Sequence, residues 1–423
     1  MTKIQIPYGS EQIELNIEGK LLILDSSSRS NIGNKKYDVI RHALQNPIGT
    51  KKLREIVATK KAAKIVVVID DHTRNAPTEK MLDALTEELG DVLNITLLVA
   101  CGTHEGPTEE DLRRMLGKCF SRFDIKIHNC DAKDLVYLGT TSRGMPISIN
   151  KNYVEADIKI LTGDITLHYY AGFGGGRKSI LPGISSRDAI KRNHALLVDK
   201  HARTANLDNN PVHLDMCEAG SFVPPDFVIN TISDNNGNLV GAYAGEMHTV
   251  FLKGVEVAKD LFCIENNDLF DILVVSAGGF PKDRNLYQAS KAVENCYRAL
   301  VPGGKFILIA ECREGIGDTY FEEWMNKYAS YEAAAAAIKT SFVLGGHKAY
   351  YMRKTMNRVR LSIVADIDSN TLTKWGINGY KSVADAVESE IGQSVTSGTE
   401  DAPKDNIKIG ILRNGLDTLL IKS

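Results

Sequence analysis

Residues 63–74 decide the fold: they read Ala63-Lys64-Ile65-Val66-Val67-Val68-Ile69-Asp70-Asp71-His72-Thr73-Arg74. The apolar run is rich in β-branched residues, and it predicts a strand that is buried on both faces of a parallel sheet. Two further runs, residues 94–100 and 156–161, predict strands of the same kind. Between the first two strands, residues 77–89 carry apolar side chains at helical spacing. This alternation of strands and helices predicts a doubly wound α/β domain.

A second unit of the same kind is expected to begin near Asp271. Residues 272–275 and 306–309 predict two buried strands, with a helix around residues 290–300 and a turn at residues 301–304 between them. We therefore expect two α/β domains with largely parallel sheets and an active site in the cleft between them. The expected bounds are 1–268 for the N-terminal, cofactor-binding domain and 269–404 for the C-terminal domain, with polar residues 265–268 as the linker. Residues 405–423 form a segment that could pack back on the first domain.

The composition argues against several classes of protein. The chain has 423 residues, of which 43% are hydrophobic and 25% charged, and these values are ordinary for a globular protein. A net charge of -2 gives no support for nucleic acid or a membrane as a partner. We find no apolar run near the roughly 20 residues that a spanning helix needs. The seven cysteines are scattered, without a Cys-x-x-Cys pair, which favours reduced thiols and a cytoplasmic location.

Unusual polar residues follow each of the first three predicted strands. Asp71 and Arg74 follow the first strand, His104 follows the second, and His168 follows the third. Each residue alone is more often part of a helix cap or a turn. Because the carboxyl ends of parallel strands border the ligand crevice of such a sheet, three consecutive clusters favour one shared site.

The densest glycine cluster is Ala171-Gly172-Phe173-Gly174-Gly175-Gly176-Arg177-Lys178-Ser179. Gly174, Gly175 and Gly176 would let backbone N–H groups approach an anion, and the next two residues add positive charge. The loop matches neither a Walker A motif nor a dinucleotide fingerprint, because Arg177 stands where each motif requires a glycine. A flexible turn is the alternative to phosphate contact. Lys178 is either an ion-pair partner or a point of covalent attachment.

Two further groups of candidates follow the glycine cluster. A helix capped by Ser185 or Ser186 carries His194, which by itself is more often structural but beside a nucleotide loop becomes a metal-ligand candidate. In the second unit, Gln288 and Lys291 share one face of a helix that opens near Asn285. A lysine near a helix N-terminus opposes the helix dipole and suggests an anionic ligand, with a solvated lysine as the alternative.

In their order and approximate spacing, these segments resemble the nickel-dependent lactate racemase family. The matching segments are residues 71–74, 102–104, 168–183, 193–194 and 287–291, and the resemblance spans essentially the whole chain. It implies an isomerase that inverts C2 of an α-hydroxy acid by hydride transfer to and from a nickel pincer nucleotide. This cofactor is a pyridinium-3-thioamide-5-thiocarboxylic acid mononucleotide that carries nickel. Enzymes of cofactor synthesis and a small α-hydroxy acid are then the expected partners.

The resemblance also implies roles for individual residues. Lys178 would carry the cofactor through a covalent thioamide, and His194 would complete the nickel coordination. His104 and His168 would be the acid–base pair, since each enantiomer's hydroxyl proton needs a base. The remaining positions would surround and support the substrate and the cofactor: Asp71, Arg74, Tyr287, Gln288 and Lys291. Arg74 and Lys291 are suited to clamp the substrate carboxylate.

One position departs from the family. A rough alignment puts His347 where the lactate enzyme has a tryptophan that lines the substrate pocket. A polar residue there favours a bulkier or more hydrophilic acid, so lactate-like, malate-like, aromatic and sugar acids all stay open. Two rival hypotheses remain, a nicotinamide-dependent 2-hydroxy-acid dehydrogenase and a non-catalytic nucleotide- or anion-binding protein. The second would leave the three histidines of the site without a joint role.

Overall fold

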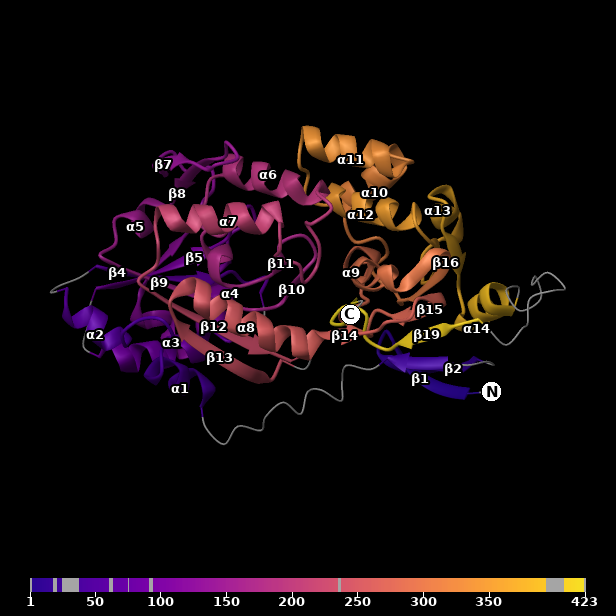
Figure 1. Cartoon of the computed structure of the whole chain (residues 1–423), viewed down its shortest axis with the longest axis horizontal. Helices are drawn as coiled ribbons and strands as arrows, with labels where there is room; N and C mark the ends of the chain where they lie inside the picture. The colour runs from indigo at the N-terminus through magenta and orange to yellow at the C-terminus, as the bar shows by residue number, and fades with distance from the viewer. Residues whose placement is uncertain are drawn as a thin grey trace. The chain divides into compact units, whose positions relative to one another are not determined.

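The computed structural model describes residues 2–17, 21–24, 38–60, 64–74, 76–90, 94–234, 237–392 and 407–421. The chain forms two compact units (Figure 1). The N-terminal unit spans Ser30–Leu261, and the C-terminal unit combines Met1–Arg29 with Phe262–Ser423. Each unit is built on one six-stranded, largely parallel sheet, which confirms the predicted α/β class.

The sheet of the N-terminal unit has the strand order β13-β12-β9-β4-β5-β6. All neighbours are parallel except β12 and β13, which pair in the antiparallel sense. The bounds are β4 (Ile65–Asp70), β5 (Ile95–Ala100), β6 (Asp124–Ile127), β9 (Ile158–Asp164), β12 (Phe227–Ser233) and β13 (Leu239–Gly245). The three strands predicted from apolar runs are therefore confirmed as β4, β5 and β9.

Helices cover both faces of this sheet. On one face, α1 (Val39–Gln45), α2 (Leu53–Ala58) and α3 (Thr78–Leu89) pack into a core of buried aliphatic residues. Figure 1 shows α6 (Arg187–Ala195) and α7 (Pro211–Phe222) on the opposite side. The other elements of the unit are α4 (Glu109–Leu116), η2 (Gly117–Arg122), β7 (Val136–Thr140), β8 (Pro146–Ile149), α5 (Lys151–Val154), β10 (Leu167–His168), β11 (Gly172–Phe173), η3 (Gly176–Ser179), η4 (Leu196–Val198) and α8 (Met247–Phe262).

The strand order places a topological switch point between β4 and β9. From β4 the chain proceeds to β5 and β6 on one side, whereas β9 and β12 lie on the other side. Ligands of open α/β sheets bind outside the carboxyl ends of the strands at such a point. Here those ends are Asp70 and Asp164.

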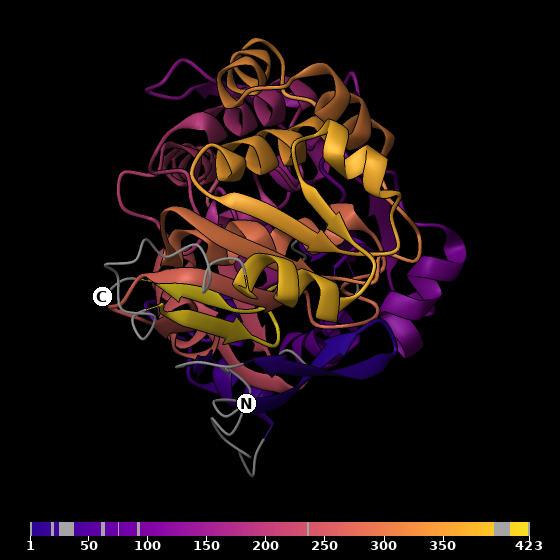
Figure 2. The ribbon, with the colours of Figure 1, turned by 90° about the vertical axis from the view of Figure 1, so that its right-hand side faces the viewer.

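The sheet of the C-terminal unit has the order β18-β17-β16-β15-β19-β3, with every neighbouring pair parallel (Figure 2). Its strands are β3 (Leu21–Leu24), β15 (Phe270–Ser276), β16 (Leu300–Ile309), β17 (Arg360–Val364), β18 (Asn378–Tyr380) and β19 (Ile409–Leu412). The predicted turn at 301–304 lies inside β16, as an irregularity in its pairing with β15.

The remaining elements of this unit include two short strand pairs. These are the antiparallel hairpin of β1 (Thr2–Tyr8) and β2 (Glu11–Ile17), and the parallel pair of β14 (Cys263–Glu265) and β20 (Leu419–Ile421). The helices are α9 (Leu286–Cys296), η5 (Tyr297–Ala299), α10 (Thr319–Lys327), α11 (Tyr331–Thr340), α12 (Gly346–Met356), α13 (Ser369–Lys374), α14 (Val383–Val387) and η6 (Glu388–Gly392).

The structure corrects the predicted domain boundaries. The N-terminal hairpin packs its apolar face, including Ile4 and Ile6, against the core of the C-terminal sheet, and β3 forms an edge of that sheet. The last strands belong to the same unit, because β19 pairs with β15 and β3 instead of packing on the N-terminal domain. The division of the chain falls at Leu261, at the end of α8, before the predicted linker.

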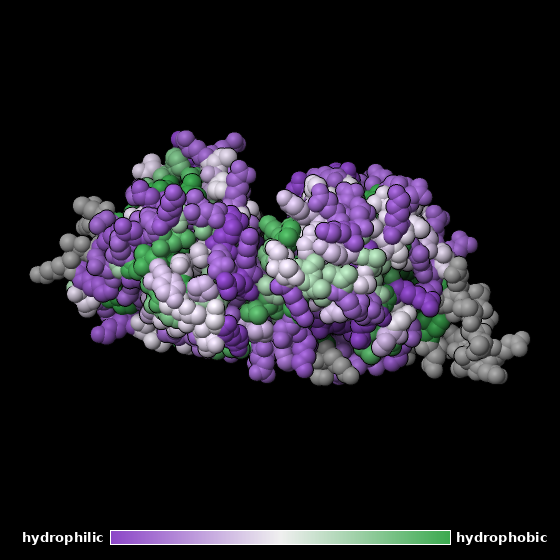
Figure 3. Space-filling model, turned by 90° about the horizontal axis from the view of Figure 1, so that it is seen from above, coloured by the Kyte–Doolittle hydropathy of each residue, from purple (hydrophilic) through white to green (hydrophobic). Residues whose placement is uncertain are grey.

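The described helices include none that is long and apolar enough to cross a membrane. The face of the molecule in Figure 3 is coloured mostly as hydrophilic, with apolar residues in separate small groups.

Candidate active site

Asp71 and His104 connect the loops that follow β4 and β5. The Asp71 side chain is 2% exposed, and its Oδ2 lies 2.6 Å from His104 Nδ1. Its Oδ1 accepts hydrogen bonds from the backbone N–H and the hydroxyl of Thr73, at 2.9 and 2.5 Å. Burial raises the pKa of Asp71, but the hydrogen bonds from His104 and Thr73 outweigh it and hold the pKa at about 2. Because this carboxylate is ionised, His104 donates through Nδ1, and Nε2 is the nitrogen that can take a proton from a ligand.

His168 follows β9 and is held in the opposite tautomer. Its Nδ1 accepts the backbone N–H of Ala171 at 3.2 Å, so the proton of the neutral ring is on Nε2. Burial lowers the pKa of His168 well below its ordinary value, and the positive charges of Lys178 and Arg74 lower it further. The ring also contacts those of Tyr169 and Tyr170, which contact each other as well. His104 therefore presents a lone pair at Nε2, and His168 presents an N–H group at Nε2.

Lys178 lies on η3, a single short turn that is fixed to the end of β9. The Ser179 hydroxyl donates to the carbonyl of Thr162 at 3.0 Å, and Lys178 N donates to the carbonyl of Gly175 at 3.2 Å. Burial lowers the pKa of Lys178 well below its ordinary value, and the charges of Arg74 and Arg177 act in the same direction. A deprotonated amine is the nucleophilic form of lysine, so the site suits covalent attachment.

The glycines before Lys178 allow close packing of the backbone. Gly174 N donates to the carbonyl of Thr166 at 2.7 Å, and a Cβ on Gly174 would lie 2.9 Å from Thr166 Oγ1. Gly175 has a φ of +75°, and its Cβ would lie 2.8 Å from Ile165 Cγ1. The loop therefore folds onto the link between β9 and β10, which explains the glycines without a ligand. Phosphate contact at this loop stays a prediction.

The sequence suggested that Arg177 would contact an anionic ligand, but its hydrogen bonds go to the protein itself. Its side chain is 1% exposed and turns inward, where it donates to the carbonyls of Ala171 and Gly175 at 2.8 and 3.2 Å. Its Nε donates to His213 Nδ1 at 3.1 Å, and its guanidinium stacks 4.1 Å from the ring centre of Phe251. A side chain with five donors in a fixed fork can hold several loop carbonyls at once. Arg177 is therefore the clamp that shapes the loop before Lys178.

Replacing Arg177 with methionine is expected to destabilise the N-terminal unit by about 3 kcal/mol, because buried carbonyls would lose their donor. Denaturant unfolding of the full chain measures this loss. Arg192→Met is the matched control, since Arg192 pairs with Asp188 where both side chains are more than half exposed, and such pairs contribute at most about 1 kcal/mol. Equal losses for both variants would contradict the clamp.

His194 lies on α6, whose N-terminus is capped by Ser186 as predicted. The ring is largely buried, with its centre 5.1 Å from that of Tyr170, and its charge acts on His168. His201 instead pairs with Asp199 at 3.1 Å on the surface, and His213 accepts from Arg177. In the part of the chain that the structure describes, no group of three or more His, Cys, Asp or Glu side chains could hold a metal ion. A metal at His194 would need most of its ligands from a cofactor.

Two carboxyl groups at the switch point, Asp70 and Asp164, were not selected from the sequence. Burial raises the pKa of Asp70 to about 6, against the lowering effect of Arg74. Burial and the charge of Asp70 raise the pKa of Asp164 to about 7, against a hydrogen bond from Thr231. Only their position at the ends of adjacent strands could have identified them from the sequence. Acidic residues at such positions can face a ligand crevice, although they can equally cap a helix.

The other predicted site residues lie in the C-terminal unit. Asn285 caps α9, which carries Tyr287, Gln288 and Lys291. Lys291 is in the second turn of this helix, so the argument from the helix dipole was wrong, since that effect fades beyond the first turn. Burial raises the pKa of Tyr287 to about 12, helped by the charge of Asp318.

His347 is packed inside the C-terminal unit. Its side chain is 1% exposed, its Nδ1 accepts the backbone N–H of Gly345 at 3.1 Å, and its ring centre lies 5.6 Å from that of Phe342. Burial lowers its pKa to about 3, and the charges of Lys348 and Lys291 add to this effect. These contacts support a role in positioning the start of α12 rather than direct contact with a substrate.

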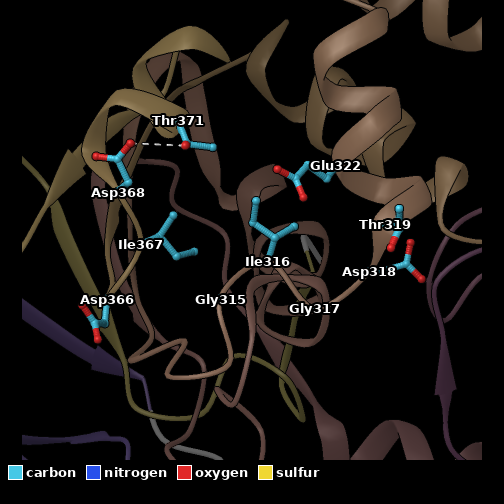
Figure 4. Close-up of a pocket in the computed structure, with 10 residues that line it drawn as sticks. All are labelled: Gly315, Ile316, Gly317, Asp318, Thr319, Glu322, Asp366, Ile367, Asp368 and Thr371. Carbon is cyan, nitrogen blue, oxygen red and sulfur yellow. Dashed lines mark hydrogen bonds between the residues drawn. The ribbon is translucent and has the colours of Figure 1, made fainter.

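A pocket of about 500 Å³ lies beyond the ends of β16 and β17 (Figure 4). Four of its lining residues are acidic, namely Asp318, Glu322, Asp366 and Asp368. Asp318 caps α10 and Asp368 caps α13, so two of these carboxylates already serve the local structure. An acidic lining disfavours a carboxylate ligand, and we do not assign the hydroxy acid to this pocket.

Two histidines and a lysine of lowered pKa follow strands at the switch point of a doubly wound sheet, and these residue types are suited to acid–base chemistry. The sequence matches the lactate racemase N-terminal domain over residues 8–205 and the lactate racemase C-terminal domain over residues 266–401. The chain therefore belongs to the lactate racemase family, and it is an isomerase of the racemase type.

Individual relatives agree with this assignment. The chain is 34% identical to a lactate racemase of Thermoanaerobacterium thermosaccharolyticum, over 77% of this chain and 78% of that one. It is 33% identical to a lactate racemase of Lactiplantibacillus plantarum, over 76% and 77%. The solved lactate racemase apoprotein from T. thermosaccharolyticum superposes with a TM-score of 0.86 at 27% identity, over the full length of both chains. A protein from Thermotoga maritima shares the fold, with a TM-score of 0.62 at 17% identity over 91% of this chain and 97% of that one.

Proposed function

We propose that this protein inverts C2 of an α-hydroxy acid by hydride transfer to and from a nickel pincer nucleotide fixed on Lys178. The observation that carries the proposal is the arrangement at the switch point, where two histidines in opposite tautomers accompany an amine of lowered pKa. Lactate is the first substrate to test, because both curated relatives are lactate racemases.

The residues present fit such a cofactor. The described residues offer no complete metal cluster, which suits a metal held mainly by an organic ligand with His194 added. The lowered pKa of Lys178 favours the neutral amine that covalent attachment needs, and Arg177 and Ser179 hold its short turn through hydrogen bonds. The bound group would supply a hydride acceptor, which lets an acid of low C–H acidity react without a carbanion.

The chain's own side chains move the hydroxyl proton. His104 takes it at Nε2, and the ionised Asp71 stabilises the imidazolium that results. His168 donates a hydrogen bond to the substrate oxygen from Nε2. For the opposite enantiomer, His168 must become the base, so its ring proton moves to Nδ1 and the bond from Ala171 is released. Arg74, which follows β4, would hold the substrate carboxylate.

The geometry disfavours a nicotinamide-dependent dehydrogenase. The glycine loop leads into η3, a helical turn of four residues, instead of the long helix whose N-terminus binds a pyrophosphate. In the C-terminal unit, the loop after β15 is bound by the N-terminal hairpin. Phe280 N donates to the carbonyl of Gly9, and Gly9 N donates to Asp283 Oδ2, both at 2.7 Å. A purely binding protein would leave the matched tautomers of His104 and His168 unexplained.

The test measures the inversion of a labelled substrate. For it, the protein is produced in a cytoplasm together with the cofactor-synthesis enzymes, which are the partners that this proposal requires. Single enantiomers of lactate, malate, phenyllactate and gluconate, each deuterated at C2, are incubated and analysed by chiral chromatography with mass spectrometry. We expect inversion with the deuterium largely retained. Loss of the label to water would indicate proton abstraction instead. Accumulation of the keto acid with added nicotinamide cofactor would favour the dehydrogenase.

The same screen tests His347. If His347 selects polar acids, gluconate or malate should exceed lactate, and His347→Trp should reverse the order. A large preference for lactate in the unaltered protein would exclude this role and agree with the burial of His347.

A further inference from the structure

The turn that follows β4 holds the Asp71 carboxylate at both of its oxygens. Oδ1 accepts the backbone N–H and the hydroxyl of Thr73, at 2.9 and 2.5 Å, and Oδ2 lies 2.6 Å from His104 Nδ1. The Asp71 side chain is 2% exposed, so these bonds come from the protein. Because each oxygen has its own partner, a partial rotation of the carboxylate would break the bonds at both ends.

The Thr73 hydroxyl also lies against the His104 ring, 3.5 Å from Nδ1. A hydroxyl has one proton to donate and two lone pairs. The shorter contact, to the ionised Asp71, takes the proton, because O–H···O⁻ bonds of about 2.5–2.7 Å are among the strong hydrogen bonds. Thr73 therefore presents a lone pair to His104 Nδ1, and so does Asp71 Oδ2.

Two acceptors beside Nδ1 select one tautomer of the neutral His104 ring. With its proton on Nδ1, the ring donates to Asp71 and meets a lone pair of the Thr73 oxygen. With its proton on Nε2, the Nδ1 lone pair would face the lone pairs of both oxygens. The hydrogen bond made by one ring nitrogen sets which nitrogen carries the proton. The tautomer selected here leaves the Nε2 lone pair for a ligand proton.

The backbone of this turn does not depend on the Thr73 hydroxyl. Arg74 N donates to the carbonyl of Asp71 at 3.1 Å, and the backbone N–H of Thr73 donates to Asp71 Oδ1. Both bonds remain when only the hydroxyl is removed. The effect of the hydroxyl on His104 can therefore be separated from the placement of Arg74.

We propose that Thr73 is a positioning residue whose hydroxyl fixes the Asp71 carboxylate and thereby keeps the proton of the neutral His104 ring on Nδ1. Thr73 acts through Asp71 and His104 and takes no part in bond making. Its consequence for catalysis rests on the proposed function, in which His104 is the base that acts at Nε2. The tautomer itself can be measured without substrate or cofactor.

The test reads the tautomer of His104 by NMR in the full-length chain, labelled with nitrogen-15 histidine and free of cofactor. At about pH 9 histidine side chains are neutral, and the shifts of the two ring nitrogens give the ratio of the tautomers. Among the ten histidines, the signals of His104 are those that disappear in His104→Gln. Thr73→Val removes the hydroxyl and Thr73→Ser keeps it. Thr86→Val is the control, because the Thr86 hydroxyl donates to the Leu82 carbonyl within α3.

We expect Thr73→Val to raise the ratio of Nε2-protonated to Nδ1-protonated His104 by about tenfold, the lower end of what a hydrogen bond to a charged group contributes. Thr73→Ser and Thr86→Val should keep the ratio of the unaltered chain.

The same variants are then co-produced with the cofactor-synthesis enzymes and assayed as racemases. Thr73→Val should lower kcat by about tenfold, in proportion to the misplaced proton. Its KM should stay within about twofold, since the backbone bond that places Arg74 remains. Thr73→Ser should restore kcat to within about threefold of the unaltered enzyme.

An unchanged tautomer ratio in Thr73→Val would overturn the inference. So would a Thr73→Ser chain that is as impaired as Thr73→Val, or a loss of kcat/KM that arises from KM, which would indicate a displaced turn around Arg74. If circular dichroism shows that Thr73→Val is unfolded, Thr73→Ala decides by the same ratio. A shifted ratio in a chain that racemises none of the hydroxy acids, even when co-produced, would refute the proposed function and leave the role of Thr73 standing.

Discussion

Lys178→Ala is expected to abolish both the covalent mass increase and the racemase activity of the co-produced protein, without unfolding it. The amine is the attachment group of the proposal, and no other side chain on η3 can form the same bond. The fold should persist because Lys178 contributes its backbone to the turn, through the bond from its N–H to Gly175, and alanine keeps that bond. Lys178 is also a buried amine that is costly to charge, so its loss removes no stabilising ion pair that the structure shows.

Intact-protein mass spectrometry, chiral assay and thermal unfolding measure the three parts of this result. Lys191→Ala is the matched control, because Lys191 lies exposed on α6 of the same unit. It should keep the mass increase and the activity. An Lys178→Ala protein that is active at the normal level, with or without bound nickel, would refute attachment at this residue.

The strands of the N-terminal sheet were predictable because they are buried on both faces. Residues of β4 and β5 form unbroken apolar runs, a pattern that depends only on the local sequence. The N-terminal hairpin also carried a signal, since Ile4 and Ile6 alternate with polar residues. Its partner could not be predicted, because the bond from Gly9 to Asp283 joins residues 274 positions apart. The domain boundaries failed for this reason.

The site was predictable where topology alone positions a residue. Parallel strands bring their carboxyl ends to one edge, and this rule was enough to associate Asp71 with His104, which the structure joins directly. The direction of a side chain within a loop is not set by such a rule. Arg177 points inward, where it donates hydrogen bonds to buried carbonyls of its own loop. The sequence does not show which buried carbonyls would otherwise lack a donor.

The same limit applies to electrostatics. Asp70 and Asp164 look like ordinary strand-end acids in the sequence. Their pKa values are raised by burial, with a further contribution from Asp71 to Asp70 and from Asp70 to Asp164. Burial and nearby cations likewise lower the pKa of His168 well below its ordinary value, and no local sequence pattern signals this shift. The chemistry of the site therefore depends on packing that spans several elements.

His104→Ala and His168→Ala are each expected to lower kcat/KM by about a hundredfold or more, the usual contribution of a general acid or base. Because the equilibrium constant of a racemisation is one, each variant must lose the same factor in both directions, even though His104 and His168 occupy opposite tautomers. Chiral assays that start from each enantiomer separately measure the two rates. His201→Ala is the control, since His201 pairs with Asp199 on the surface. A loss below about threefold for either His104→Ala or His168→Ala, in protein whose covalent loading is normal by mass, would remove that histidine from the acid–base role.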